Sequence, residues 1–143
     1  MTDGRRMRAR PHWWVSVAQA MLLLPLVRLM LWARGYRRTM RLVSGQTSDP
    51  TGVDGPAEIP TEVAEIASAV TAVARLVPFR SRCLARSITI GWLSRRHGHT
   101  VDVLIGVAPP EGTQLPAHAW AEYRGNPLND TADVRTRYIV ISP

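Results

Sequence analysis

Apolar residues recur at helical spacing in two segments of the chain. The first stripe alternates steps of four and three between residues 22 and 43, with arginines lying off it; its members are Leu22, Leu26, Leu29, Ala33, Tyr36, Met40 and Val43. The second stripe follows Pro60 and Thr61 and stops before Pro78; its members are Val63, Ile66, Ala67, Val70, Val73, Ala74 and Val77. Both patterns predict helices that bury one face against protein.

A third helical period begins after Pro78, and strands follow it. Leu84, Ile88 and Trp92 continue the period up to Gly98, a residue typical of helix ends. Beyond Gly98 the pattern changes to alternation over residues 101–107 and 117–123, and residues 137–141 are also rich in strand-forming types. The chain therefore predicts an α+β fold, in which N-terminal helices precede an antiparallel sheet.

Residues 44–60, "SGQTSDPTGVDGPAEIP", combine glycine, proline, serine and threonine and lack periodic apolar positions. This composition is typical of a linker. It divides the chain into an N-terminal helical docking segment, residues 1–43, and a core, residues 61–143. A length of 143 residues suits one compact core.

The segment "WWVSVAQAMLLLPLVRLMLWA", residues 13–33, is long enough to cross a bilayer. Arg28 inside such a span would cost about 2.5–3.5 kcal/mol, which disfavours insertion. A cleaved signal peptide would need a small-residue cleavage site, whereas the segment ends in Trp32, Ala33 and Arg34. Packing against protein is the favoured interpretation, with membrane contact as the main alternative.

The net charge of +7 comes from arginine alone, because the chain contains no lysine. Arginines cluster in residues 5–10, 34–41 and 80–96, which favours acidic partners. Nucleic acid is not expected, since no zinc-finger spacing, phosphate loop or aromatic-interleaved strand accompanies the charge. The single cysteine excludes an internal disulfide and a multi-thiolate zinc site, so we expect no metal, no cofactor and a cytoplasmic location.

That cysteine, Cys83, falls in the first turn of the third predicted helix. Unpaired backbone amides and the positive end of the helix dipole favour a thiolate there, and Arg82 and Arg86 add positive charge. Cys83 is therefore a candidate nucleophile. The alternative is that it is a small buried apolar residue.

Two further residues complete a candidate catalytic set with Cys83. His118 shares one face of the strand 117–123 with Trp120 and Glu122. If residues 124–126 form a three-residue turn, Asp130 returns on the face of His118, whereas a two-residue turn would place it on the opposite face. Nucleophile, base and orienting carboxylate are the groups that acyl transfer requires. Taken singly, His118 also suits a strand and Asp130 a turn.

The stretches "CLARSITIGWLSRRHGHTVDVLIGV", "AHAWAEY" and "ND" resemble the lasso peptide biosynthesis leader peptidases, the B2 proteins, over residues 63–141. The resemblance implies a papain/transglutaminase-like core, in which the cysteine begins a helix packed on an antiparallel sheet that carries the histidine and aspartate. It implies Cys83 as nucleophile, His118 as base and Asp130 as orienting acid. It further implies a cysteine peptidase that frees the core peptide before a separate cyclase closes the macrolactam.

The resemblance also implies partners. These are the precursor peptide, a separate small leader-binding protein of the B1 type, and the macrolactam cyclase. The leader-binding protein is expected to be separate because residues 1–60 lack a strand-rich segment. The N-terminal stripe and its arginines are the candidate docking surface, with the membrane as the competing partner. Two other functions stay open: a transglutaminase-like acyltransferase that joins glutamine to an amine, and a basic scaffold in which Cys83 is a core residue.

Overall fold

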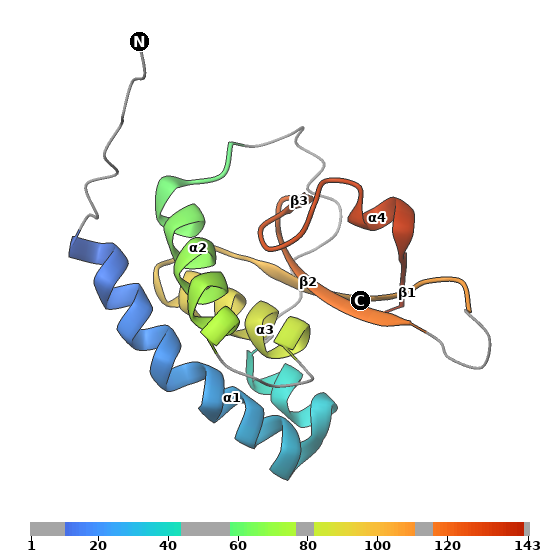
Figure 1. The fold of residues 1–143 in the computed structure, drawn as a ribbon, viewed down its shortest axis with the longest axis horizontal. Coiled ribbons are helices and arrows are strands. Elements are labelled where there is room, and N and C mark those ends of the chain that lie inside the picture. Colours follow the sequence, from blue (N-terminus) through green and yellow to red (C-terminus); the bar gives the residue numbers. More distant parts are fainter. Residues whose placement is uncertain (1–10, 44–57, 77–81, 111–115, 142–143) are drawn as a thin grey trace.

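The computed structural model describes residues 11–43, 58–76, 82–110 and 116–141. Three long helices pack beside a four-stranded antiparallel sheet (Figure 1). The helices are α1 (Pro11–Val43), α2 (Thr61–Leu76) and α3 (Arg82–Arg96). The strands are β1 (Asp102–Val107), β2 (Ala117–Tyr123), β3 (Asn126–Pro127) and β4 (Ile139–Val140), in the spatial order β3-β2-β1-β4, with the short helix α4 (Val134–Arg137) before β4. The predicted α+β class is confirmed.

Helices α2 and α3 follow the predicted periods. The buried residues of α2 include every predicted stripe position that the structure describes; Val77 lies outside the described residues. Helix α3 ends before Gly98, whose φ of +82° is a left-handed conformation that glycine adopts without strain. Cys83 is the second residue of α3, as the pattern predicted.

Helix α1 uses a different face from the predicted one to contact the core. Its buried residues Ala20, Leu24 and Val27 share one apolar cluster with α2 and α3. The first four positions of the predicted stripe, Leu22 to Ala33, face outward instead, with Leu22 76% and Leu29 57% exposed; the side chains of its later positions lie outside the described residues. Because both sides of α1 are apolar, periodicity alone does not distinguish them.

The inward side of α1 completes the core between α2 and α3. The division of the chain into a docking segment, residues 1–43, and a core, residues 61–143, stays a prediction. Most of the predicted linker, residues 44–57, lies outside the described residues. By length and composition Trp13–Gly35 is able to cross a membrane, but core helices of soluble proteins pass the same test.

The turn between β2 and β3 is shorter than predicted. Tyr123 pairs with Asn126, so the loop contains two residues, Arg124 and Gly125. Both have positive φ, +47° and +81°, as a type I′ hairpin turn requires. The prediction of a three-residue turn was wrong, because it did not anticipate that an arginine would adopt the left-handed region.

Gly106 of β1 provides a test of this sheet. A Cβ at Gly106 would lie 2.8 Å from Cβ of Tyr138 and 2.9 Å from Cη2 of Trp120. Gly106→Ala should therefore lower the free energy of unfolding by about 1–3 kcal/mol, since a ring or the strand must shift. Urea denaturation measures the effect. Gly91→Ala is the control, because its single close contact, 3.1 Å to Val103, is offset by better helix propensity. Equal stability of Gly106→Ala and the parent would contradict this packing.

Candidate active site

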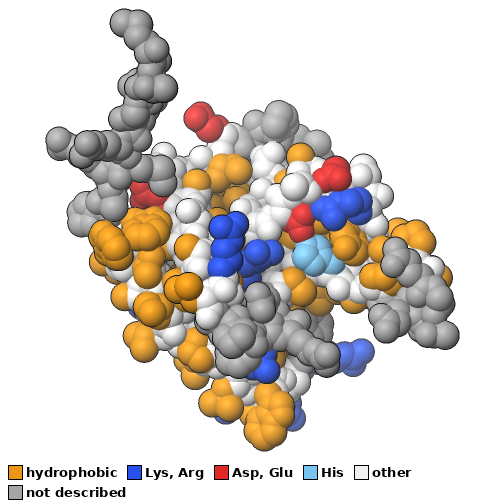
Figure 2. Space-filling view, viewed as in Figure 1, with side chains coloured by type: hydrophobic (Ala, Val, Ile, Leu, Met, Phe, Trp, Pro, Cys, Tyr) orange, Lys and Arg blue, Asp and Glu red, His pale blue; other side chains and the backbone are white. Residues whose placement is uncertain are grey.

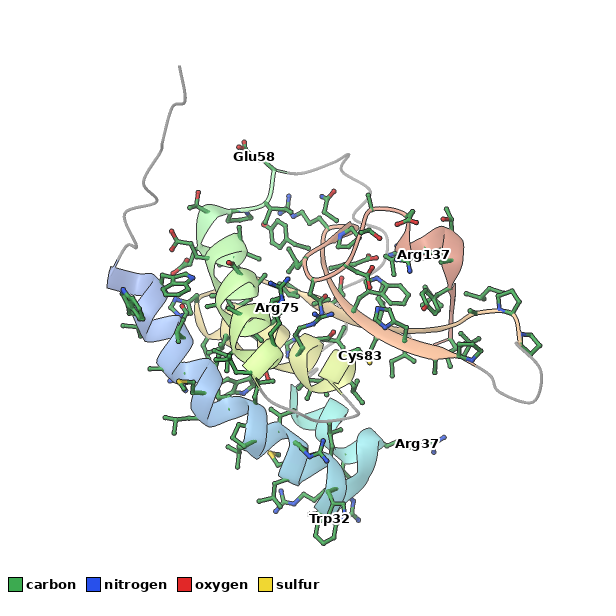
Figure 3. All side chains as sticks on the ribbon, viewed as in Figure 1. Trp32, Arg37, Glu58, Arg75, Cys83 and Arg137 are labelled. Atoms are coloured by element: carbon green, nitrogen blue, oxygen red, sulfur yellow. The ribbon has the colours of Figure 1, made fainter. Side chains whose placement is uncertain are left out.

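The start of α3 is bound to the strand that carries His118. The Ser87 hydroxyl lies one helical turn after Cys83 and donates to the Cys83 carbonyl at 2.7 Å. It also lies 3.2 Å from the carbonyl of Ala119, the residue next to His118 in β2. Figure 3 shows Cys83 at the end of α3 that lies beside β2. One buried hydroxyl thus connects the cysteine turn to the histidine strand.

Asn129 strengthens the same junction. Its amide Nδ2 donates to the Ser87 hydroxyl at 3.0 Å, and its Oδ1 accepts the backbone N–H of Ala121 at 2.8 Å. The guanidinium of Arg86 donates to the Asn129 carbonyl at 3.0 Å. The sequence interpretation gave Ser87 and Asn129 no role, although Ser87 lies four residues after Cys83 and Asn129 directly precedes Asp130. Both residues form hydrogen bonds between segments that lie far apart in the sequence, which local patterns do not reveal.

Asp130 and His118 form a hydrogen bond between Oδ2 and Nε2. Strand alternation alone would not bring them together. If β3 continued in the observed register, residue 130 would lie opposite Ala119 and therefore on the other face of the sheet from His118. The ladder instead ends after the Leu128 N–H, which bonds the Ala121 carbonyl at 2.8 Å. Residues 128–130 then bend out of the strand, which frees Asp130 from strand alternation. The predicted neighbour of His118 is present, but the turn-based argument for it was wrong.

The Asp130 carboxylate stays ionised in this environment. Burial raises its pKa, but hydrogen bonds from His118, the Thr131 backbone and Arg137 lower the pKa more, so the net shift is downward. Oδ1 accepts the Thr131 N–H at 2.7 Å and a guanidinium N–H of Arg137 at 2.8 Å. Because an ionised carboxylate only accepts hydrogen bonds, Nε2 of His118 carries a proton, and Nδ1 of the neutral ring has a lone pair.

Two aromatic rings hold the imidazole of His118. Trp120 stacks with it at a centroid distance of 6.1 Å, and Tyr138 lies at 5.1 Å. The indole N–H of Trp120 donates to the carboxylate of Glu122 at 2.7 Å. Arg135 binds both oxygens of the same buried carboxylate, at 2.8 and 2.6 Å. The imidazole is therefore fixed by packing as well as by Asp130.

The single turn of α4 supplies the two arginines that bind the carboxylates of this site. Arg135 binds Glu122, which holds Trp120, and Arg137 binds Asp130, which holds His118. Each carboxylate is more buried than its arginine: Glu122 and Asp130 have side chains 2% and 13% exposed. The buried charges are thus compensated, as buried carboxylates require.

Cys83 is a free, partly buried thiol with a cation close by. Burial lowers the pKa of the half-buried Arg86, while negative charge on Asp130 and on Cys83 raises it. Arg86 therefore lies within electrostatic reach of both groups. The side chain of Arg82, the other predicted cation, lies outside the described residues. Among the described residues, no cluster of three or more His, Cys, Asp or Glu side chains is arranged to hold a metal ion.

A thiol, an imidazole and a carboxylate are the groups that acyl transfer requires. The structure pairs His118 with Asp130 and binds the cysteine turn to the neighbouring backbone. The catalytic roles of the three residues remain predictions.

Comparison with known proteins gives one match. A sequence profile of the transglutaminase-like superfamily matches residues 20–143. The match includes α1 from its buried Ala20 onward, together with Cys83, His118 and Asp130. Curated proteins and solved structures gave no match.

Proposed function

Because the chain belongs to the transglutaminase-like superfamily, we propose that it is a cysteine peptidase that removes the leader from a ribosomally synthesised lasso peptide precursor. The superfamily includes cysteine peptidases and acyltransferases. The observation that carries the proposal is the hydrogen bond between His118 and Asp130. The strand of His118 is connected to the helical turn of Cys83 through the Ser87 hydroxyl.

In the proposed mechanism, Nδ1 of His118 takes the proton of the Cys83 thiol, and the sulfur attacks the scissile carbonyl carbon. The imidazolium then protonates the leaving amine, which leaves a thioester on Cys83. Water, activated by the neutral imidazole, releases the leader and restores the thiol. Asp130 orients the ring and stabilises its charged form. Backbone N–H groups at the start of α3, including that of Cys83, are candidate donors to the oxyanion.

The leader specificity rests on the sequence resemblance, through "CLARS", "HAWAE" and "ND". The protein would act on the precursor together with a separate leader-binding protein and before a separate cyclase. The test is to incubate the protein with precursor peptides and leader-binding proteins encoded by neighbouring reading frames, and to follow masses. One hydrolytic cut between leader and core is expected. A product joined to an added amine would favour the acyltransferase alternative, and no reaction with any precursor would overturn the proposal.

We propose further that the outward face of α1 docks the leader-binding partner. This face contains Leu22, Leu26, Leu29 and Trp32, which are 76%, 49%, 57% and 85% exposed. The exposed Arg34 follows on the same helical segment, and the exposed Arg37 and Arg38 come after Gly35, whose φ of 73° and ψ of 164° interrupt the helix. An apolar stripe beside cations suits an amphipathic surface with acidic groups on the partner.

Changing Leu22 and Leu29 together to glutamine should impair only the partner-dependent step. We expect at least a tenfold rise in KM for a leader presented by the partner, and unchanged cleavage of a short free peptide, because both side chains lie outside the core. Leu76→Gln on α2 is the control, since Leu76 is also 76% exposed. Unchanged KM in the double variant would contradict docking here. Retention of the parent in membranes until detergent is added would assign the face to lipid instead.

A further inference from the structure

A groove runs along α2 beside the candidate active site. It has a volume of about 590 Å³, with α2 on one side and the segment Pro127–Thr131 on the other. Asp130, which holds His118, lines one part of it, so the groove adjoins the proposed catalytic groups. Small residues of α2, among them Ala64 and Ala72, leave this space open, and the hydroxyl-bearing Ser68 and Thr71 line it.

Two arginines give the groove its charge. Arg75, in the last turn of α2, and Arg86 of α3 both line it. They lie close enough for the charge of Arg75 to lower the pKa of Arg86, after the larger effect of burial. Figure 2 shows basic side chains together at the centre of this face, and Figure 3 shows Arg75 on α2, the helix next to α3.

The two cations differ in how far they are compensated. Arg86 is half-buried, donates to the Asn129 carbonyl and feels the negative charge of Asp130. Arg75 is exposed, and among the described residues no carboxylate pairs with it. The repulsion between the two guanidinium groups would be relieved by an anion held in the groove.

We infer that this groove binds an acidic residue of the peptide substrate, whose side-chain carboxylate pairs with Arg75. The inference rests on the proposed peptidase function and names part of its specificity. A guanidinium binds a carboxylate through two parallel hydrogen bonds, which selects glutamate or aspartate over the neutral amides. The hydroxyls of Ser68 and Thr71 offer further hydrogen bonds to the peptide. Arg86 holds the Asn129 segment in place and is not the expected ligand.

Matched peptides test this selectivity. Each spans the junction between leader and core, has an amidated C-terminus, and carries one glutamate, one glutamine or one lysine at each flanking position in turn. At one position the parent should cleave the glutamate peptide with a kcat/KM at least tenfold higher than the glutamine peptide. Arg75→Gln should abolish that preference, and Arg75→Glu should reverse it in favour of lysine. Arg96→Gln, an exposed arginine outside the groove, should keep it. Circular dichroism checks that each variant folds.

Binding to the Cys83→Ala protein, measured by calorimetry with the same peptides, separates the two proposals. Tighter binding of the glutamate peptide that is lost in Cys83→Ala/Arg75→Gln supports the groove, even if the parent cleaves no peptide and the peptidase function fails. Equal cleavage and equal binding of the glutamate and glutamine peptides at every position would overturn the groove inference and leave the peptidase function standing. A preference that persists in Arg75→Gln would also overturn it.

Discussion

Replacing Cys83 with alanine should abolish leader removal and leave the fold intact. The residue is only partly buried and lies in the first turn of α3, so the change removes little packing but the whole nucleophile. We expect kcat/KM to fall by at least about 10⁴-fold, the scale on which catalytic triads lose activity when a member is removed. Mass spectrometry of the precursor reaction measures the rate, and the melting temperature checks the fold.

Cys83→Ser is the matched variant for this experiment. It keeps a polar group of similar size at the start of α3 but replaces the thiol with a much weaker nucleophile. It should be as inactive as Cys83→Ala. Cleavage by either variant at the parental rate would remove Cys83 from the mechanism.

The second large effect is expected at Asp130. Asp130 and Asp133 both bind Arg137 and Thr131, but of these two carboxylates only Asp130 forms a hydrogen bond with His118. Asp130→Ala should therefore lower kcat by about 10²–10⁴-fold, because the imidazole loses its orientation and the charge that stabilises its protonated form. Asp133→Ala should lower kcat less than tenfold.

Kinetics on purified variants, corrected for the folded fraction, make the comparison. The order of the two effects is decisive: a larger loss in Asp133→Ala would mean that the contact with His118 is not the functional one. Stability offers a second readout. Because folding lowers the pKa of Asp130, its contribution is present above its unfolded value of about 3.9 and is lost as pH falls through the folded value. The stability gap between parent and Asp130→Ala should therefore shrink in acid.

The helices next to the site were predictable because local signals agree. Pro60 and Thr61 mark the entry to α2, Pro78 the break after it, and Gly98 the end of α3, while apolar positions keep one period between these marks. Those signals also placed Cys83 in the first turn of a helix. Helix α1 lacks such agreement, because residues on both of its sides are apolar and only its packing against α2 and α3 selects the buried one.

The candidate site was harder to predict because it depends on contacts between distant segments. Nothing local in "RGN" reveals that Arg124 takes a left-handed conformation, and this choice sets the register of β3. The bend after Leu128 then brings Asp130 to His118. The bonds of Ser87 and Asn129 join α3 to β2 across more than thirty residues, a separation that spacing rules do not address.

Alkylation of the single cysteine tests the central claim most directly, which is that His118 activates Cys83. Since Cys83 is the only thiol, one mass increase with iodoacetamide reports its reactivity without interference. Near neutral pH the parent should react at least tenfold faster than His118→Ala, because the imidazole accepts the thiol proton and stabilises the thiolate. Equal rates in the two proteins would show that Cys83 and His118 are not coupled, and would contradict the account.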